Sequence, residues 1–162
     1  MPRLSERTLA VLHADVAVPT YDRALLKPGV LHIGVGGFHR AHQAMYLDRL
    51  LDQGGDPSWA VCGVGMLRSD LAMHHALEPQ DCLYTLVLKG TDGSVRPRVI
   101  GSISRYLFAP HDPGTVVARM AEPATQIVSL TITEGGYQVS DATGEFEVTP
   151  EVRRSPDGSS RT

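Results

Sequence analysis

The sequence of 162 residues has only two cysteines, no excess of basic residues and no long hydrophobic run. Two cysteines, Cys62 and Cys82, are too few for a disulfide framework and predict buried, reduced thiols in a cytoplasmic protein. Fifteen lysines and arginines against eighteen acidic residues give a net charge of −3, which argues against a nucleic-acid partner, because such proteins carry a basic face. No apolar run is long enough to span a bilayer, and the first residues lack the apolar core of a signal peptide. No membrane partner is therefore expected.

What the sequence does contain is ordinary for a globular protein, with 42% hydrophobic and 20% charged residues. A chain of this length has the size of one domain and can bury a hydrophobic core.

The most informative stretch runs from Val30 to His42, with the sequence VLHIGVGGFHRAH. It begins as a short apolar run typical of a buried strand, and Gly34, Gly36 and Gly37 then crowd into four positions. A strand, a glycine turn and a helix together aim free backbone amides at a phosphate, so the pattern predicts a dinucleotide site. The G-x-G-x-x-G motif is incomplete because His39 takes the third glycine position, and a purely structural tight turn is the alternative.

A single helix is expected from Phe38 to the glycine pair at 54–55. The helical period separates its residues into an apolar arc and positions that lie mostly off this arc. The arc consists of Ala41, Ala44, Met45, Leu47 and Leu51, and the residues mostly off it are His39, Arg40, Gln43, Arg49 and Asp52.

The next elements predict a parallel crossover followed by an antiparallel excursion. Residues 59–65 have the pattern of a second buried strand, which fits a right-handed strand–helix–strand unit, and a short helix is expected over residues 70–78. Two β-rich runs, 83–89 and 95–108, flank an Asp-Gly turn and predict a hairpin.

Asp112 is the expected N-cap of a short helix that has Pro113 at its first position. Residues 126–133 are continuous and β-branched, as expected of a central parallel strand. The fold class expected is therefore α/β: a Rossmann-like, mostly parallel sheet with an antiparallel hairpin excursion, forming an incomplete N-terminal domain. Residues 1–28 are a lead-in, 29–147 the partial dinucleotide-binding domain, and 148–162 a polar, disordered tail.

Several blocks in one order and without large gaps carry a family resemblance. They are GVLHIGVGGFHRAHQAMYLD from Gly29, VPTYDR from Val18, QDCLYTL from Gln80, VIGSI from Val99 and IVSLTITEGGY from Ile127. Together they resemble the mannitol dehydrogenase family, the long-chain polyol dehydrogenases and the related fructuronate and tagaturonate reductases. The resemblance implies an oxidoreductase with an N-terminal Rossmann-like domain and a C-terminal helical domain. It implies NAD as the coenzyme, with NADP as the alternative, and a small polyol or ketose as the substrate. Interconversion of mannitol and fructose is favoured over the fructuronate or tagaturonate reductase reaction.

The coenzyme is expected to contact the glycine turn and the end of the second strand. The expected contacts are Gly34, Val35, Gly36, Gly37, Phe38, His39, Arg40 and Asp70. By resemblance, His39 and Arg40 lie near the coenzyme phosphates, although a satisfied structural histidine is the alternative for His39. Asp70 is the first carboxylate after the second strand, and it either holds a ribose hydroxyl or caps the following helix. Arg68 beside it favours a 2′-phosphate, which keeps NADP open.

Glu134 follows the last strand between a buried run and two glycines, a position that can raise the pKa of a carboxyl. By resemblance it relays the alcohol proton to solvent, and a solvated loop acid is the alternative. His39 and His42 share a helix face, but no further ligand cluster joins them, so no metal site is expected. His74 and His75 are expected at the surface.

The sequence contains no asparagine, and Lys27 and Lys89 are its only lysines. By resemblance, the family's lysine base stands in a K-x-x-x-x-N-x-x-H helix of the C-terminal domain; this motif is not found in the sequence, and the domain that carries it is expected to be absent. The chain is expected to hold part of a dinucleotide without turning over a polyol by itself. Three interpretations stay open: the N-terminal portion of a polyol dehydrogenase, a non-catalytic nucleotide-binding module, and a partly folded remnant.

Overall fold

The computed structural model describes residues 3–12, 14–132, 139–140 and 142–146. The chain divides into two compact units, Met1–Thr131 and Ile132–Thr162. The first unit contains all the helices and strands named below. In the second unit the described structure includes one antiparallel bridge, between Val139 and Phe146.

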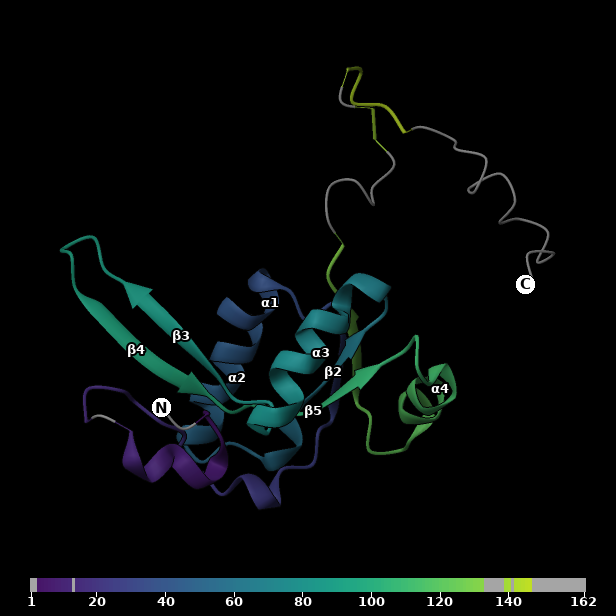
Figure 1. Ribbon diagram of the computed structural model, residues 1–162. Coiled ribbons are helices and arrows are strands. Elements are labelled where there is room, and N and C mark those ends of the chain that lie inside the picture. The colour runs from purple at the N-terminus through teal and green to yellow at the C-terminus, as the bar shows by residue number, and fades with distance from the viewer. Residues whose placement is uncertain (1–2, 13, 133–138, 141, 147–162) are drawn as a thin grey trace. The chain divides into compact units, whose positions relative to one another are not determined.

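A parallel sheet of four strands in the order β5-β2-β1-β6 forms the centre of the first unit (Figure 1). The strands are β1 (Val30–Ile33), β2 (Val61–Gly65), β5 (Ile103–Phe108) and β6 (Ile127–Leu130). Val30 pairs with Val61 on one side and with Ile127 on the other, in parallel register. The expected α/β class and the parallel β1–β2 crossover are confirmed.

Helices cover both faces of this sheet (Figure 1). They are α1 (Gly37–Ala41), α2 (Gln43–Asp52), α3 (Leu71–Leu77) and α4 (Pro113–Ala121). Since successive strand residues point to opposite faces, Val30 and Leu31 belong to different clusters. Val30 packs with Ala44 and Leu77 from α2 and α3, whereas Leu31 packs with Val116 from α4. As expected, the Asp112 side chain accepts the backbone N–H of Thr115 at the start of α4, at 3.0 Å.

The helix that was expected to run unbroken from Phe38 is interrupted at His42, where φ is −122° and ψ is −82°. His39 and Ala44 are both buried. Five residues apart on one straight helix, they would point about 140° away from each other. The break gives α1 and α2 different orientations and lets both side chains reach the sheet.

Two further expectations about the sheet were wrong. The run 95–108 is two strands, because the chain leaves the hairpin at Gly101–Ser102 and β5 then pairs with β2 in the main sheet. Among the described strands, β6 is an edge strand and not a central one. A β-branched run is compatible with either position, so composition alone did not distinguish them.

The expected hairpin is present as β3 (Tyr84–Lys89) and β4 (Val95–Ile100), which pair in antiparallel register. It projects from the body of the unit (Figure 1). Gly93 has φ of +80° in its turn, a conformation that suits glycine. Asp48 of α2 is fully buried beneath the hairpin, where its carboxylate accepts bonds from Tyr21, Arg98 and the Gly101 amide.

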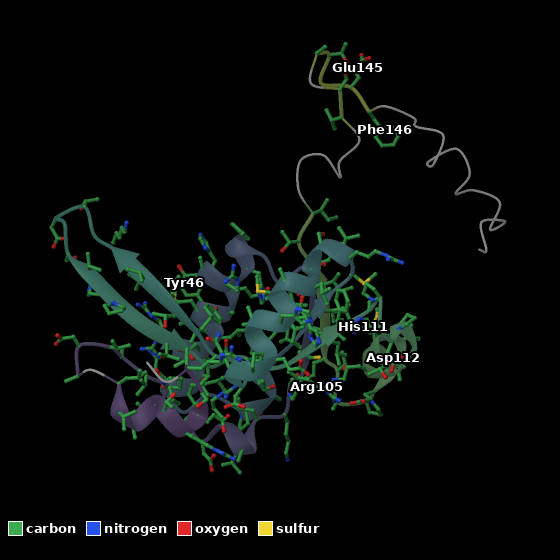
Figure 2. All side chains as sticks on the ribbon, viewed as in Figure 1. Tyr46, Arg105, His111, Asp112, Glu145 and Phe146 are labelled. Atoms are coloured by element: carbon green, nitrogen blue, oxygen red, sulfur yellow. The ribbon has the colours of Figure 1, made fainter. Side chains whose placement is uncertain are left out.

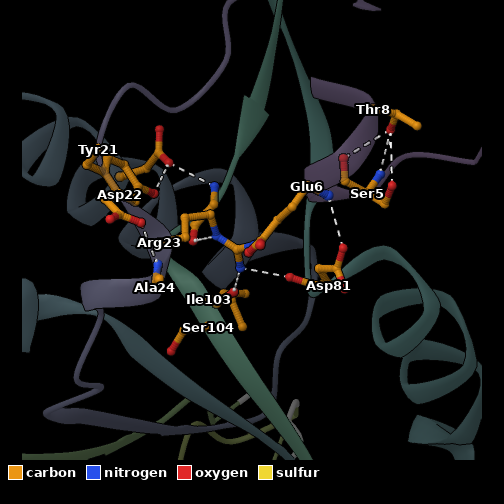
Figure 3. A network of polar contacts seen from close by, with 12 residues as sticks. Ser5, Glu6, Thr8, Tyr21, Asp22, Arg23, Ala24, Asp81, Ile103 and Ser104 are labelled. Carbon is orange, nitrogen blue, oxygen red and sulfur yellow. Dashed lines mark hydrogen bonds and ion pairs between the residues drawn. The ribbon is translucent and has the colours of Figure 1, made fainter. Parts of the chain in front are cut away.

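The N-terminal segment also lies against the base of the hairpin, at Gly101. Arg23 donates to the carbonyls of Asp81, Gly101 and Ile103 and forms an ion pair with Glu6 (Figure 3). Short 3-10 turns complete the unit: η1 (Glu6–Val11), η2 (Arg23–Leu25), η3 (Pro57–Trp59), η4 (Arg68–Asp70) and η5 (Glu78–Gln80). None of the helices in the described part of the chain has the length and hydropathy that a membrane span needs.

Candidate functional site

The turn between β1 and α1 is tight because of its glycines. Gly34 has φ of +90°, a left-handed conformation that glycine adopts without a steric cost. Its amide donates to the Val64 carbonyl of β2 at 2.9 Å, and the Gly36 amide donates back to the Gly34 carbonyl at 2.7 Å. The turn therefore fixes the start of α1 at the carboxyl end of β1.

The outer side of this turn is open. A Cβ built on Gly36 would meet only the Gly34 carbonyl oxygen, at 4.0 Å, and one built on Gly37 would meet nothing within 4 Å. Within the described residues, no acceptor is found for the amides of Gly37, Phe38 and His39. Open space and free N–H groups suit an anionic group such as a phosphate. The described ranges contain no cluster of ligands that could hold a metal ion.

The side chains of the turn have different surroundings. Val35 is buried and packs close to Gly63 of β2, so only its backbone faces the turn. Phe38 is 68% exposed, and its ring stacks on that of His42 with centroids 4.7 Å apart. Arg40 donates from Nε to the Gly36 carbonyl at 3.3 Å, and its guanidinium carbon lies 5.7 Å from the centre of the Tyr84 ring.

His39 was expected off the apolar face, and the structure buries it to 1% exposure. Its ring stacks on His32 of β1, and His32 bonds through its two nitrogens to Ser129 of β6 and to Thr131, which follows β6 directly. Neither ring nitrogen of His39 has a hydrogen-bond partner among the described residues. It is thus a buried histidine but not a satisfied one. In the complete G-x-G-x-x-G motif, the third glycine lets helix and strand pack in direct backbone contact. Here the two stacked rings lie between α1 and β1 instead. His42 stacks on Phe38, so the two histidines do not form a pair.

Burial lowers the pKa of His39 to about 3, with smaller contributions from His32 and Arg40. Burial also lowers the pKa of His32. Both imidazoles are therefore neutral at physiological pH.

Asp70 lies just beyond the carboxyl end of β2, as expected, in the short turn before α3. Its Oδ2 accepts the backbone N–H of Leu67 at 2.9 Å, and its side chain does not cap α3. One carboxylate oxygen is thus engaged by the protein backbone.

A pocket of about 320 Å³ opens beside Asp70, at the carboxyl ends of β2 and β5. It is lined by Arg68, Leu71, Phe108, Pro110 and His111. Figure 2 shows His111 next to Asp112, in the loop that leads from β5 to α4. In open α/β sheets, ligands bind at this edge. The sequence pattern did not single out His111, because residues 103–108 were assigned to the hairpin. The β-rich run followed by a loop and a capped helix could have indicated that this loop lies at the carboxyl end of a sheet strand.

His74, which was expected at the surface, is half-buried and stacks on Phe108 and Tyr106 behind this pocket. His75 is exposed, as expected. Cys62 and Cys82 are buried free thiols, in agreement with the expectation. Glu134 lies outside the described residues.

The sequence profile of the mannitol dehydrogenase Rossmann domain matches residues 28–156. A mannitol 2-dehydrogenase of Aspergillus niger is 53% identical over 133 residues, which are 82% of this chain and 27% of the relative. One of Pyrenophora tritici-repentis is 47% identical over 146 residues, which are 90% of this chain and 25% of the relative.

Two solved structures share the fold. One is the Pseudomonas fluorescens mannitol 2-dehydrogenase ternary complex with NAD and D-mannitol, with a TM-score of 0.82 and 44% identity over 90% of this chain. The other is a D-sorbitol dehydrogenase in substrate-free form, with a TM-score of 0.76 and 43% identity over 89% of this chain. The chain covers 30% of each. It belongs to the mannitol dehydrogenase family and matches the Rossmann domain of that family.

Proposed function

We propose that this chain binds NAD(H) and is the coenzyme-binding part of a polyol dehydrogenase that interconverts mannitol and fructose. The observation that carries the proposal is the open glycine turn in a chain of this family. Gly36 and Gly37 leave room for a pyrophosphate. The first backbone amides of α1 donate no hydrogen bond to an acceptor among the described residues. The solved Pseudomonas fluorescens relative binds NAD and D-mannitol, which supports the choice of ligand.

The residues of this chain would bind and orient the coenzyme. The backbone from Gly34 to Arg40 would hold the pyrophosphate, and Asp70 would accept a ribose hydroxyl through its free oxygen. The bound nicotinamide supplies the hydride acceptor and donor. Glu134, which follows β6 in the sequence, would pass the alcohol proton to solvent. The reduced cysteines favour a cytoplasmic enzyme.

The lysine base and the groups that polarise the substrate oxygen would lie in a C-terminal region. That region corresponds to the part of the relatives that this chain does not cover. The sequence supports this division, because it has no asparagine and neither Lys27 nor Lys89 stands in the family's motif. Residues 29–147 would then form the dinucleotide-binding part, preceded by the lead-in 1–28 and followed by the polar segment 148–162.

A coenzyme titration combined with a mannitol oxidation assay tests the proposal. We expect the chain to bind NADH with a dissociation constant in the micromolar range and to show no turnover of mannitol by itself. Absence of NADH binding would remove the coenzyme role. Turnover by this chain alone would contradict the proposed division of catalytic residues.

A further inference from the structure

The pocket beside Arg68 suggests which dinucleotides the chain accepts, an inference that rests on the proposed function. We propose that this pocket holds the adenosine end of the coenzyme and accepts a 2′-phosphate, so that the chain binds NADP(H) about as well as NAD(H).

The lining of the pocket suits a purine. Phe108 is a buried residue of this lining, and the His111 ring stands perpendicular to the Phe108 ring with centroids 4.7 Å apart. Leu71 and Pro110 add apolar surface. A flat base packs well against aromatic and apolar groups of this kind. The pocket is formed by the loops after β2 and β5, two neighbouring parallel strands, so it adjoins the ribose position at Asp70.

The charges around the ribose position do not match a site that selects NAD alone. In such a site an acidic side chain binds the ribose 2′-hydroxyl and repels a 2′-phosphate. Here the Asp70 carboxylate has one oxygen bonded to the Leu67 amide. One oxygen is left for a ribose hydroxyl, and a positive charge beside it is needed to offset its repulsion of a 2′-phosphate.

Arg68 supplies the opposing charge. It lines the pocket and is exposed, and no ion pair or hydrogen bond from its guanidinium to another described residue is found. A guanidinium without a protein partner is able to bind a phosphate through two parallel hydrogen bonds. The neighbouring Ser69 hydroxyl adds a further donor at the exposed turn.

Titration of the full 162-residue chain tests this inference, with NADH, NADPH, 5′-AMP and 2′,5′-ADP as the probes. We expect the dissociation constants of NADH and NADPH to agree within about tenfold, and 2′,5′-ADP to bind more tightly than 5′-AMP. Arg68→Ala should weaken NADPH and 2′,5′-ADP by about tenfold or more while NADH changes less than about threefold. Arg96→Ala, which removes an exposed arginine of the hairpin, is the matched control for the change in net charge.

The outcomes separate the two proposals. Tight NADH binding with NADPH weaker by about a hundredfold or more would overturn the inference and leave the coenzyme role intact. Equal effects of Arg68→Ala on NADH and NADPH would also overturn it. Failure of NADH and 5′-AMP alike to bind would overturn the proposed function itself.

Discussion

The ring of His39 lies flat on the ring of His32, with centroids 3.8 Å apart and planes 8° from parallel. One imidazole comes from the first turn after the glycines and the other from the central strand β1, so the stack ties α1 to the sheet. Two protonated rings at this separation would repel each other strongly in a buried site. The attachment of α1 therefore depends on neutral histidines.

This arrangement predicts a loss of stability in acid. The folded-state pKa of His39 is about 3 and that of His32 is also lowered, whereas an unfolded chain has ordinary histidines near 6.5. The unfolded state thus binds more protons below that value, so this stabilisation is complete above about pH 6.5 and is lost as the pH falls. His39 should cost up to about 1.4 kcal/mol per pH unit below pH 6.5, and His32 should add to the loss, measured by urea unfolding between pH 8 and 5. His39→Phe should flatten this dependence, whereas His75→Gln, at an exposed position, should leave it unchanged. An unaltered slope in His39→Phe would contradict the prediction.

Substitutions at two glycines should separate folding from coenzyme binding. Gly36 has φ of −84° and open space at its Cβ position, so Gly36→Ala should change the free energy of unfolding by less than about 1 kcal/mol. The methyl group would stand where a pyrophosphate approaches, and NADH should bind about tenfold or more weakly. Gly34→Ala places a side chain at φ +90° and should also destabilise the fold by about 1–2 kcal/mol. Unaltered NADH binding by both variants would argue against the glycine turn as the phosphate site.

Asp48 is predicted to be a major source of stability. Its buried carboxylate pairs with Arg98 and accepts bonds from the Tyr21 hydroxyl and the Gly101 amide. Asp48→Asn removes the charge beneath Arg98 at almost constant volume, and it should lower the free energy of unfolding by about 3 kcal/mol in urea titrations. Asp56→Asn is the control, because Asp56 is exposed and bonds locally to Ser58. A loss no larger than that of the control would contradict this role.

The two thiols should not react while the chain is folded. Burial raises the pKa of Cys82 to about 11 and also raises that of Cys62, and both cysteines are buried. Since the thiolate is the reactive form, a thiol-specific chromogenic reagent at pH 8 should label neither cysteine until denaturant is added. Fast labelling of the native chain would contradict the burial seen here.

The sequence was most informative where local patterns determine structure. The apolar run, the glycines and the β-branched stretches predicted β1, β2 and the hairpin, and Asp112 with Pro113 predicted the start of α4. These features depend on backbone conformation and side-chain period over a few residues. The open turn at Gly36 and Gly37 lies where the motif placed it, although the coenzyme contacts themselves stay predictions.

Features that depend on distant partners were not predictable in the same way. The break at His42 arises because His39 and Ala44 each find a place on the sheet. The buried charge of Asp48 is compensated by Arg98, fifty residues away in the chain. The pocket at His111 appears only once β5 is known to pair with β2. In each case tertiary contacts, and not local propensity, decide the outcome.

The cluster at Asp48 also has a consequence for how the chain opens. Asp48 is part of α2, and its carboxylate links this helix to two other segments. It bonds to Tyr21 of the N-terminal segment, and to Arg98 and Gly101 of the hairpin and its end. None of these segments can detach without leaving a buried charge or donor unpaired. Backbone amides in all three should therefore exchange with deuterium as one cooperative unit, at a rate set by a shared opening event.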